Sequence, residues 1–203
     1  MSSSPVNKMR LYSAQSERLY LNATEVDRFL HAANNAPEMV RLFALTLAYT
    51  GMRLSEACCL RRDSIQADAR VLSVLSLKKR QKRTVREIPM PAELAGAYQA
   101  LDLEKSGWIW GDRFSPVPRI TAYRWIKHLM AQAKIDGPKA CPKGLRHAFG
   151  ARATMAGVPL HMLQRWMGHA SMETTAIYAT VLGPDQLRLS DQMWEATEKP
   201  KNN

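Results

Sequence analysis

A histidine and a tyrosine near the end of the chain are spaced so that both could act on one ligand. His169 directly follows Gly168, where we expect a helix to end, and Tyr178 lies nine residues further on, in the next short helix. A histidine held beside a helix end can donate a hydrogen bond to a charged ligand, and the tyrosine could be a nucleophile. A plain helix-turn-helix with a capping histidine and a packed tyrosine has the same spacing, so this motif needs its structural context.

Arg53 is a first candidate for binding an anion. It follows a helix break at Gly51 and stands at the entry of the next helix, where unpaired backbone N–H groups and the helix dipole favour negative charge. A guanidinium group there can donate two parallel hydrogen bonds to a phosphate. The alternative is a solvated arginine paired with a nearby carboxylate such as Glu56.

Two further cations share the start of a later helix. Lys143 and Arg146 are three residues apart, so they lie on one face of the helix expected over residues 143–157. Two cations on one face favour an anion site there. His147 comes next in the chain, and we expect it to orient its neighbours or to pack in the core, not to act in catalysis.

The hydrophobic period changes at residue 70, which indicates a β-hairpin. Residues 71–77 are apolar and β-branched, residues 84–90 resemble a returning strand, and five of the six residues between them are cations (Lys78, Lys79, Arg80, Lys82 and Arg83). Such a charge run is usually a solvated surface. A rigid two-stranded ribbon that carries it would also suit insertion into a DNA groove.

The composition indicates a polyanionic partner. The 203 residues include 29 Lys and Arg against 18 Asp and Glu, a formal net charge of +11. A chain of this length can bury the core of one ordinary domain. Excess positive charge favours nucleic acid over a membrane surface as the partner, and a merely soluble basic protein is the alternative.

The cysteines and the apolar runs indicate where in the cell the protein is found. Cys58, Cys59 and Cys141 have no zinc-type spacing, which indicates reduced thiols. The longest apolar run is too short to cross a bilayer, and the N-terminus lacks the apolar centre of a signal peptide. We therefore expect a cytoplasmic protein.

Most of the elements that must position these residues are helices. The apolar periodicity predicts helices over residues 21–33, 37–50, 91–103, 120–133, 143–157 and 158–168. In the fourth of these helices, Arg124 and Lys127 are candidates for contacts with a nucleic-acid backbone. The six helices and the hairpin together predict a mainly α fold with a small antiparallel β-sheet (α+β).

The expected domain boundaries leave a short segment at each end. Residues 1–20 are predicted to be a flexible basic arm, residues 21–182 the folded domain, and residues 183–203 a C-terminal helix with a disordered tail. The apolar side of that last helix either folds back on its own core or docks on another subunit.

Five short motifs, in the order in which they occur, resemble those of the tyrosine recombinase (phage integrase) family. They are TGMRLSEA at residues 50–57, LKKR and REIP in the hairpin, KGLRH at 143–147, LQRWMGH at 163–169 and TTAIY at 174–178. The likeness extends from about residue 21 to the end. It implies the catalytic-domain fold of that family, in a short form made of the catalytic domain.

The resemblance implies a role for each main candidate. Tyr178 would attack a DNA phosphate, giving a 3′-phosphotyrosyl link and a free 5′-hydroxyl, and the hydroxyl of a partner strand would reverse the step. Arg53 and Arg146 would hold the non-bridging oxygens and neutralise charge that grows in the transition state. His169 would add a hydrogen bond to the same phosphoryl group.

The hairpin cations take two roles under the same resemblance. Lys78 would protonate the leaving 5′ oxygen as general acid, and Lys79 is the alternative because this hairpin is longer than usual. The remaining cations would contact DNA (Lys79, Arg80, Lys82, Arg83, Arg124 and Lys127).

One departure from the family concerns the base. The family most often has histidine at the position of Lys143. A lysine can hold the phosphate and the tyrosine oxygen, but it must lose its proton before it can act as a base. Since a free tyrosine has a pKa of about 10, deprotonation also needs a cationic pocket. The identity of the base stays open.

The resemblance also implies partners. They are double-stranded DNA, further copies of the chain in a tetramer on paired sites, and accessory DNA-bending proteins, in the bacterial nucleoid and with neither metal nor other cofactor. The N-terminal core-binding domain of most members is missing, which indicates either a truncated chain or the short fimbrial-switch type that Met1 favours. The alternatives are a DNA-binding accessory protein without catalysis and a type IB topoisomerase.

Overall fold

The computed structural model describes residues 9–76, 85–101, 107–112, 114–180 and 191. These residues are mostly helical and include one small antiparallel sheet, which confirms the predicted fold class. The elements are α1 (Ala23–Asn34), α2 (Glu38–Thr50), α3 (Leu54–Cys58), η1 (Arg62–Ser64), β1 (Ile65–Gln66), β2 (Val71–Leu75), β3 (Val85–Pro89), α4 (Ala92–Gln99), α5 (Arg119–Gln132), α6 (Pro142–Met155), α7 (Leu160–Met167), α8 (Glu173–Ala176) and η2 (Ile177–Thr180).

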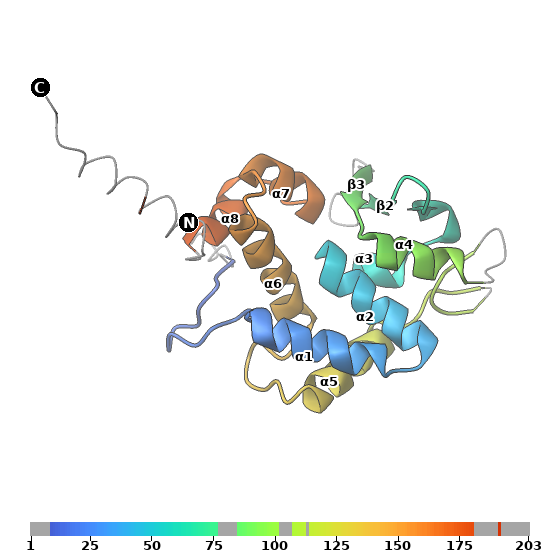
Figure 1. Ribbon diagram of the computed structural model, residues 1–203, viewed down its shortest axis with the longest axis horizontal. Coiled ribbons are helices and arrows are strands. Elements are labelled where there is room, and N and C mark those ends of the chain that lie inside the picture. Colours follow the sequence, from blue (N-terminus) through green and yellow to red (C-terminus); the bar gives the residue numbers. More distant parts are fainter. Residues whose placement is uncertain (1–8, 77–84, 102–106, 113, 181–190, 192–203) are drawn as a thin grey trace, which may run out of the picture.

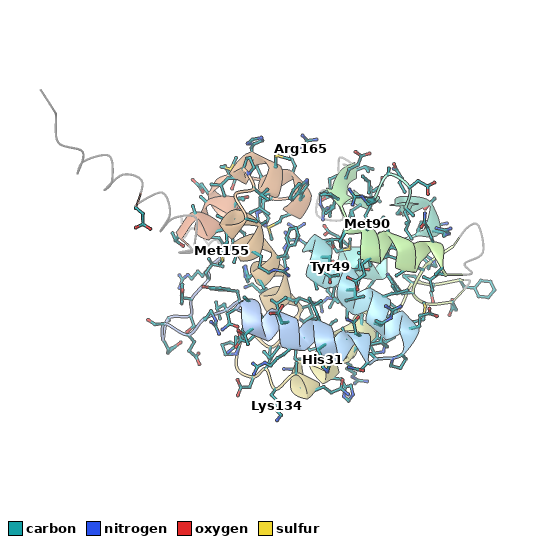
Figure 2. All side chains as sticks on the ribbon, viewed as in Figure 1. His31, Tyr49, Met90, Lys134, Met155 and Arg165 are labelled. Carbon is teal, nitrogen blue, oxygen red and sulfur yellow. The ribbon has the colours of Figure 1, made fainter. Side chains whose placement is uncertain are left out.

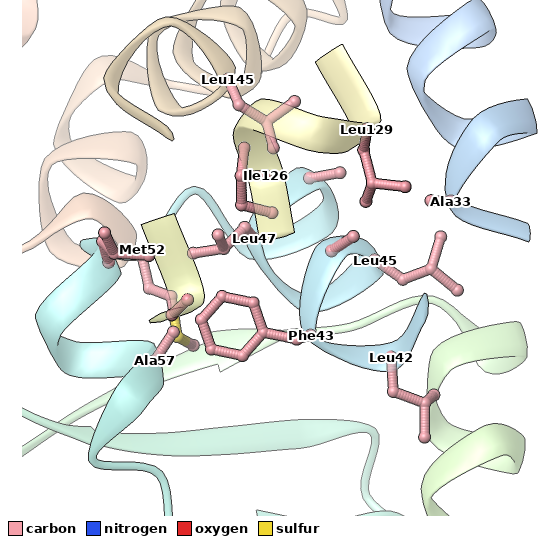
Figure 3. Packing of buried hydrophobic residues seen from close by; sticks show 14 of the residues in the cluster. Ala33, Leu42, Phe43, Leu45, Leu47, Met52, Ala57, Ile126, Leu129 and Leu145 are labelled. Carbon is pink, nitrogen blue, oxygen red and sulfur yellow. The ribbon is translucent and has the colours of Figure 1, made fainter. Parts of the chain in front are cut away.

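Helix α2 lies at the centre of the core. Most of its residues are buried, as expected for a helix that is apolar on nearly all sides, and it packs against α1, α4, α5 and α6. Phe43 meets Trp110 and Trp125 edge to face, with ring centroids 5.3 and 5.6 Å apart. Figure 3 shows Phe43, Leu47 and Ile126 meeting in this core. Helices α3, α5 and α6, on or next to which several candidates lie, are therefore packed against α2.

The sheet is antiparallel, with its strands in the order β1-β2-β3. Leu72 pairs with Ile88 and Val74 pairs with Arg86. Because side chains alternate between the faces of a strand, this register puts Leu72, Val74 and Ile88 into the core. The two strands of the predicted hairpin are thus present, and β1 adds an edge strand that sequence analysis did not anticipate. The hairpin tip, residues 77–84, lies outside the described residues.

Figure 1 shows α6, α7 and α8 on one side of the molecule and α3, α4 and the sheet on the other, with α1 and α5 below. The two sides meet where α7 contacts β3. Helix α2 ends at Gly51 (φ 59°) and α7 ends at Gly168 (φ 62°), in the left-handed conformation that glycine adopts without strain. These two turns bring Arg53 and His169 directly after a helix end.

The N-terminal segment differs from the flexible arm that sequence analysis predicts. Residues 1–8 are outside the described part, but Leu11 is buried in a cluster with α6 and α7, and a β-bridge joins Tyr12 to Arg18. Arg18 also forms a 2.9 Å ion pair with Glu25. One apolar side chain and one ion pair, neither of which shows in the polar composition, hold residues 9–20 against the domain.

The predicted C-terminal helix over residues 183–203 falls outside the described residues apart from Asp191. Of the helices in the described ranges, none is both long and apolar enough to cross a membrane.

Candidate active site

Three arginines from three elements bind three successive backbone carbonyls at the end of α7. Arg86 of β3 donates from Nε to the oxygen of Trp166 (2.8 Å). Arg146 of α6 donates to Met167 (2.6 Å), and Arg53, at the start of α3, donates to Gly168 (3.0 Å). The last carbonyls of a helix have no partner within the helix and carry its negative dipole end. We call this arrangement the arginine clamp (Arg53, Arg86 and Arg146); it fixes the residue that follows Gly168, which is His169.

One buried carboxylate joins two members of the clamp. Glu56 accepts hydrogen bonds from the backbone and the guanidinium of Arg53, both at 2.9 Å, and from Arg86 at 2.7 Å. Burial alone would raise the pKa of Glu56, but the hydrogen bond and charge of Arg86, followed by those of Arg53, bring that pKa below its usual value. Glu56 is therefore ionised at neutral pH and holds both arginines in position.

The clamp carries surplus positive charge. Glu56 pairs with Arg53 and Arg86, whereas Arg146 forms no ion pair among the described residues, so three guanidinium groups stand against one carboxylate. Arg146 is 6% exposed, and burial followed by the charge of Arg53 lowers its pKa to about 9. Buried positive charge of this kind is stabilised by an anion. The arrangement suits an anion such as a phosphate, and phosphate binding by Arg53 and Arg146 stays a prediction.

His169 lies beside the clamp as a buried, neutral side chain. Its Nδ1 is 2.9 Å from the hydroxyl oxygen of Thr175, and its Nε2 is buried with no hydrogen-bond partner in the described part of the chain. Burial, then the charges of Arg146 and Arg53, lower the pKa of His169 to about 3. If Thr175 donates to Nδ1, the proton of the neutral ring is on Nε2, which can then donate to an anion at the clamp.

Tyr178 of η2 is fully buried next to this histidine. Its ring is parallel to that of His169 with centroids 6.4 Å apart, and a Cβ atom on Gly150 would come within 2.4 Å of its Cζ. Its hydroxyl oxygen is 3.0 Å from Nδ1 of His147. Burial raises the pKa of Tyr178 above its usual value, although the charge of Arg146 opposes this shift. The phenol is therefore protonated in this state.

The structure brings Arg53, Arg146, His169 and Tyr178 together, as sequence analysis predicts. Lys143 is exposed at the start of α6 and, within the described residues, makes no hydrogen bond to Tyr178. The candidates of the hairpin tip lie outside the described residues (Lys78, Lys79, Arg80, Lys82 and Arg83).

Neither DNA-contact candidate of α5 forms a hydrogen bond or ion pair with the clamp among the described residues. Lys127 donates from Nζ to the carbonyl of Ala140 (2.9 Å) and so supports the loop before α6. Arg124 lines a surface pocket with Val40 and Trp125, near the first turn of α2. Arg53 follows the C-terminal end of α2, which has 13 residues. The two ends of such a helix are about 20 Å apart, so Arg124 is remote from the site. DNA contact by either residue stays a prediction.

Basic side chains also reach other surfaces. Figure 2 shows Arg165 projecting from α7 and Lys134 at the opposite edge of the molecule, beyond α5.

In the described ranges, no group of three or more His, Cys, Asp or Glu side chains is arranged to hold a metal ion.

The supporting residues of the site do not follow from the sequence. Glu56 is expected there only as a partner of a solvated Arg53, and His147 is expected not to act in catalysis. Arg86 had a usable signal, because it alternates with Val85 and Glu87 and so shares the inward face of β3 with Ile88. An arginine at an inward position needs a buried partner. His147 had no such signal, since its contact with Tyr178 spans 31 residues.

A double-mutant cycle tests whether Glu56 and Arg86 act as a unit. We expect Glu56→Gln to lower the free energy of unfolding by about 3 kcal/mol or more, because it leaves the buried guanidinium of Arg86 without an acid. Arg86→Met should cost about 1.5–3 kcal/mol, because it removes charged hydrogen bonds while Arg53 still pairs with Glu56. The double variant should lose clearly less than the sum. Urea unfolding measures all three. Arg165→Met, at an exposed position, is the matched control with an expected change within about 0.5 kcal/mol. Additive losses would contradict the coupling.

Gly150→Ala tests the packing of the tyrosine. The new methyl group would overlap the ring of Tyr178, so we expect the ring to leave its buried position and become reactive. Nitration by tetranitromethane, located by mass spectrometry, should modify Tyr178 in the variant and not in the wild type. Gly96→Ala is the matched control, since a Cβ at that helical position meets nothing within 4 Å. Equal protection of Tyr178 in all three chains would argue against the observed packing.

The two buried histidines predict how stability depends on pH. The pKa of His147 is lowered to about 3, chiefly by burial and then by Lys143 and Arg146, and that of His169 is also lowered to about 3. Between about pH 6.5 and 3 the unfolded chain therefore binds protons that the folded chain does not. The free energy of unfolding should fall with falling pH, by up to about 1.4 kcal/mol per pH unit for each histidine.

Urea unfolding at several pH values measures this slope. His147→Asn should flatten it, whereas His31→Asn, at an exposed position of α1, serves as the control. An unchanged slope in His147→Asn would show that His147 is not held neutral.

Comparison with known proteins agrees with this geometry. The profile of the phage integrase family matches residues 19–183. A tyrosine recombinase of Thermosipho africanus is 30% identical over 165 residues, which make up 80% of this chain and 57% of that protein. A resolvase of Escherichia coli is 28% identical over 197 residues, and the match covers 82% of this chain and 75% of that protein.

Solved structures show the same fold. The crystal structure of XerA recombinase has a TM-score of 0.68 and 27% identity, covering 89% of this chain and 65% of that chain. The catalytic domain of bacteriophage HP1 integrase has a TM-score of 0.61 and 21% identity, covering 91% and 100%, a likeness that shows the fold alone. The chain spans little more than half the length of the first curated relatives. It belongs to the phage integrase family and has the fold of a tyrosine recombinase catalytic domain.

Proposed function

We propose that this chain is a site-specific DNA recombinase or integrase that cleaves and rejoins DNA strands through a 3′-phosphotyrosyl intermediate. The observation that carries the proposal is the convergence of Arg53, Arg146, His169 and Tyr178 around the end of α7. This site combines surplus positive charge with one nucleophile. Family membership supports the same activity.

The clamp suits the transition state of phosphoryl transfer. A guanidinium group has five N–H donors, and the two bonds that Arg53 and Arg146 each donate from Nη1 and Nη2 leave donors available. Donors that are already held in place stabilise developing negative charge without reorganising. In the proposed reaction both arginines bind the non-bridging oxygens, and Nε2 of His169 donates a third hydrogen bond.

The remaining roles rest on the hairpin and on partners. Lys78, with Lys79 as the alternative, protonates the leaving 5′ oxygen, and β3 ties this hairpin to the site through Arg86. The substrate is double-stranded DNA, to which the net charge of +11 is suited. Two duplexes are exchanged in a tetramer, with accessory DNA-bending proteins, in the bacterial nucleoid. The arginines supply the positive charge that a metal ion provides in other nucleases.

Trapping the covalent intermediate tests the proposal. Nicked duplexes tiled across the DNA that flanks the gene are mixed with the protein and run on a denaturing gel, because a nick beside the cleavage point lets the short fragment leave and prevents rejoining. We expect a slowly migrating adduct, absent in Tyr178→Phe. Arg146→Ala should slow its formation by about 100-fold or more, as loss of a transition-state donor does elsewhere, and Arg165→Ala is the control.

The outcomes separate the alternatives. A recombinase gives adducts and exchanged products on paired sites, whereas a type IB topoisomerase relaxes supercoiled DNA without exchange. A DNA-binding accessory protein retards DNA on a native gel and gives neither. Retarded DNA with no adduct on any nicked duplex would refute the proposed activity.

A further inference from the structure

The nucleophile has one side-chain partner that no assigned role explains. Within the described residues, the only hydrogen bond that the Tyr178 hydroxyl makes is to Nδ1 of His147, at 3.0 Å. Both side chains are fully buried, and His147 precedes Gly150 by one turn of α6, so the two residues form one wall of the tyrosine pocket. Lys143, the residue that stands where the family most often has its histidine, is exposed one turn earlier.

The imidazole of His147 is set up to accept this hydrogen bond. Burial, then the charges of Lys143 and Arg146, lower its pKa to about 3, so the ring is neutral at physiological pH and keeps one nitrogen lone pair. A buried phenol donates its proton where it can. Because Tyr178 is protonated and faces Nδ1, the tautomer in which Nδ1 accepts this bond carries its ring proton on Nε2. That nitrogen is buried and has no hydrogen-bond partner in the described part of the chain.

We propose that His147 is a catalytic residue that takes the phenolic proton of Tyr178 during strand cleavage and returns it during rejoining. This inference rests on the proposed function. In cleavage the O–H bond of Tyr178 breaks and an N–H bond forms at Nδ1, while the phenolic oxygen bonds to phosphorus and the bond from phosphorus to the 5′ oxygen breaks. The 5′ oxygen takes its proton from the general acid. In rejoining, the 5′-hydroxyl gives its proton to the now deprotonated general acid and its oxygen bonds to phosphorus. The bond from phosphorus to the tyrosine oxygen breaks, and the imidazolium of His147 gives its proton back to that oxygen.

The substrate itself makes this transfer possible. In the free chain, burial and the positive charges of Lys143 and Arg146, both on α6, oppose an imidazolium at His147. The nearby His169 is itself neutral, because burial and the charges of Arg146, Arg53 and Arg86 oppose its protonation. The proton therefore stays on Tyr178 and the nucleophile is inactive. A phosphodiester anion at the clamp offsets these charges and favours the protonated histidine. Basicity then rises only when the phosphate that Tyr178 attacks is in place.

His147→Asn separates a base from a group that merely positions the tyrosine. The side-chain oxygen of asparagine can replace Nδ1 as hydrogen-bond acceptor, but it cannot take up a proton. On nicked duplexes at saturating protein, we expect the single-turnover rate of adduct formation to fall by about 100-fold or more, with DNA affinity on a native gel unchanged. A rate equal to that of the wild type would overturn the proposal and leave His147 with a positioning role.

A second test of the proposal uses a more acidic nucleophile at position 178. Incorporation of a fluorinated tyrosine at position 178 lowers the pKa of the phenol and so reduces the need for a base. It should restore most of the rate lost in His147→Asn and change the rate of the chain with His147 little. Lys143→Gln is the matched control and should cost less. A loss in His147→Asn that fluorination does not restore would overturn the proposal.

A measurement on the unsubstituted chain does not depend on any variant folding. Nitrogen-15 NMR of labelled histidine distinguishes the two neutral tautomers, and the chain has only five histidines to assign. We expect the proton of His147 on Nε2. A proton on Nδ1 would overturn the proposal, because no lone pair would then face Tyr178. Absence of any adduct from the wild type would overturn the proposed function as well, whereas a wild-type rate in His147→Asn overturns only this inference.

Discussion

The site depends on the hydrogen bonds between the arginine clamp and the last carbonyls of α7. The carbonyl oxygens of Trp166, Met167 and Gly168 each accept a hydrogen bond from a different arginine. These are Arg86 of β3, Arg146 of α6 and Arg53 at the start of α3, in that order. Helix termini are where backbone acceptors lack partners, so one short helix end can connect three separate elements. The same guanidinium groups that complete this helix also supply the positive charge of the site. The interactions that hold the site together therefore come from the same side chains that give the site its charge.

Burial gives this charge its effect. Glu56 balances part of it from a fully enclosed position, and the remaining positive charge lies in surroundings that screen it poorly. Burial and this charge together keep His147 and His169 neutral, whereas burial keeps Tyr178 protonated against the opposing charge of Arg146. The described groups of the site are thus assembled in the free chain, and their surplus positive charge is of the kind that an anion stabilises.

Much of the fold followed from local patterns. The helices around α2 appear where apolar residues recur with helical spacing, and the hairpin strands appear where that period changes. Glycines at positions 51 and 168 end helices as expected. Residues 9–20 did not follow from such a pattern, because Leu11 is held by contacts with residues more than 130 positions away. Polar composition describes an average over a segment and does not reveal one buried side chain.

The sequence alone determined which chemical groups are present and which helix ends they follow. Arg53, Arg146, His169 and Tyr178 were identified because motifs and capping positions are local properties of the chain. Only the tertiary structure decided what supports them, since the contacts of Glu56 with Arg86 and of His147 with Tyr178 join residues 30 and 31 positions apart. Hydrogen bonds of that kind depend on how elements pack, and packing is set by shape and burial across the whole domain, not by spacing along the chain.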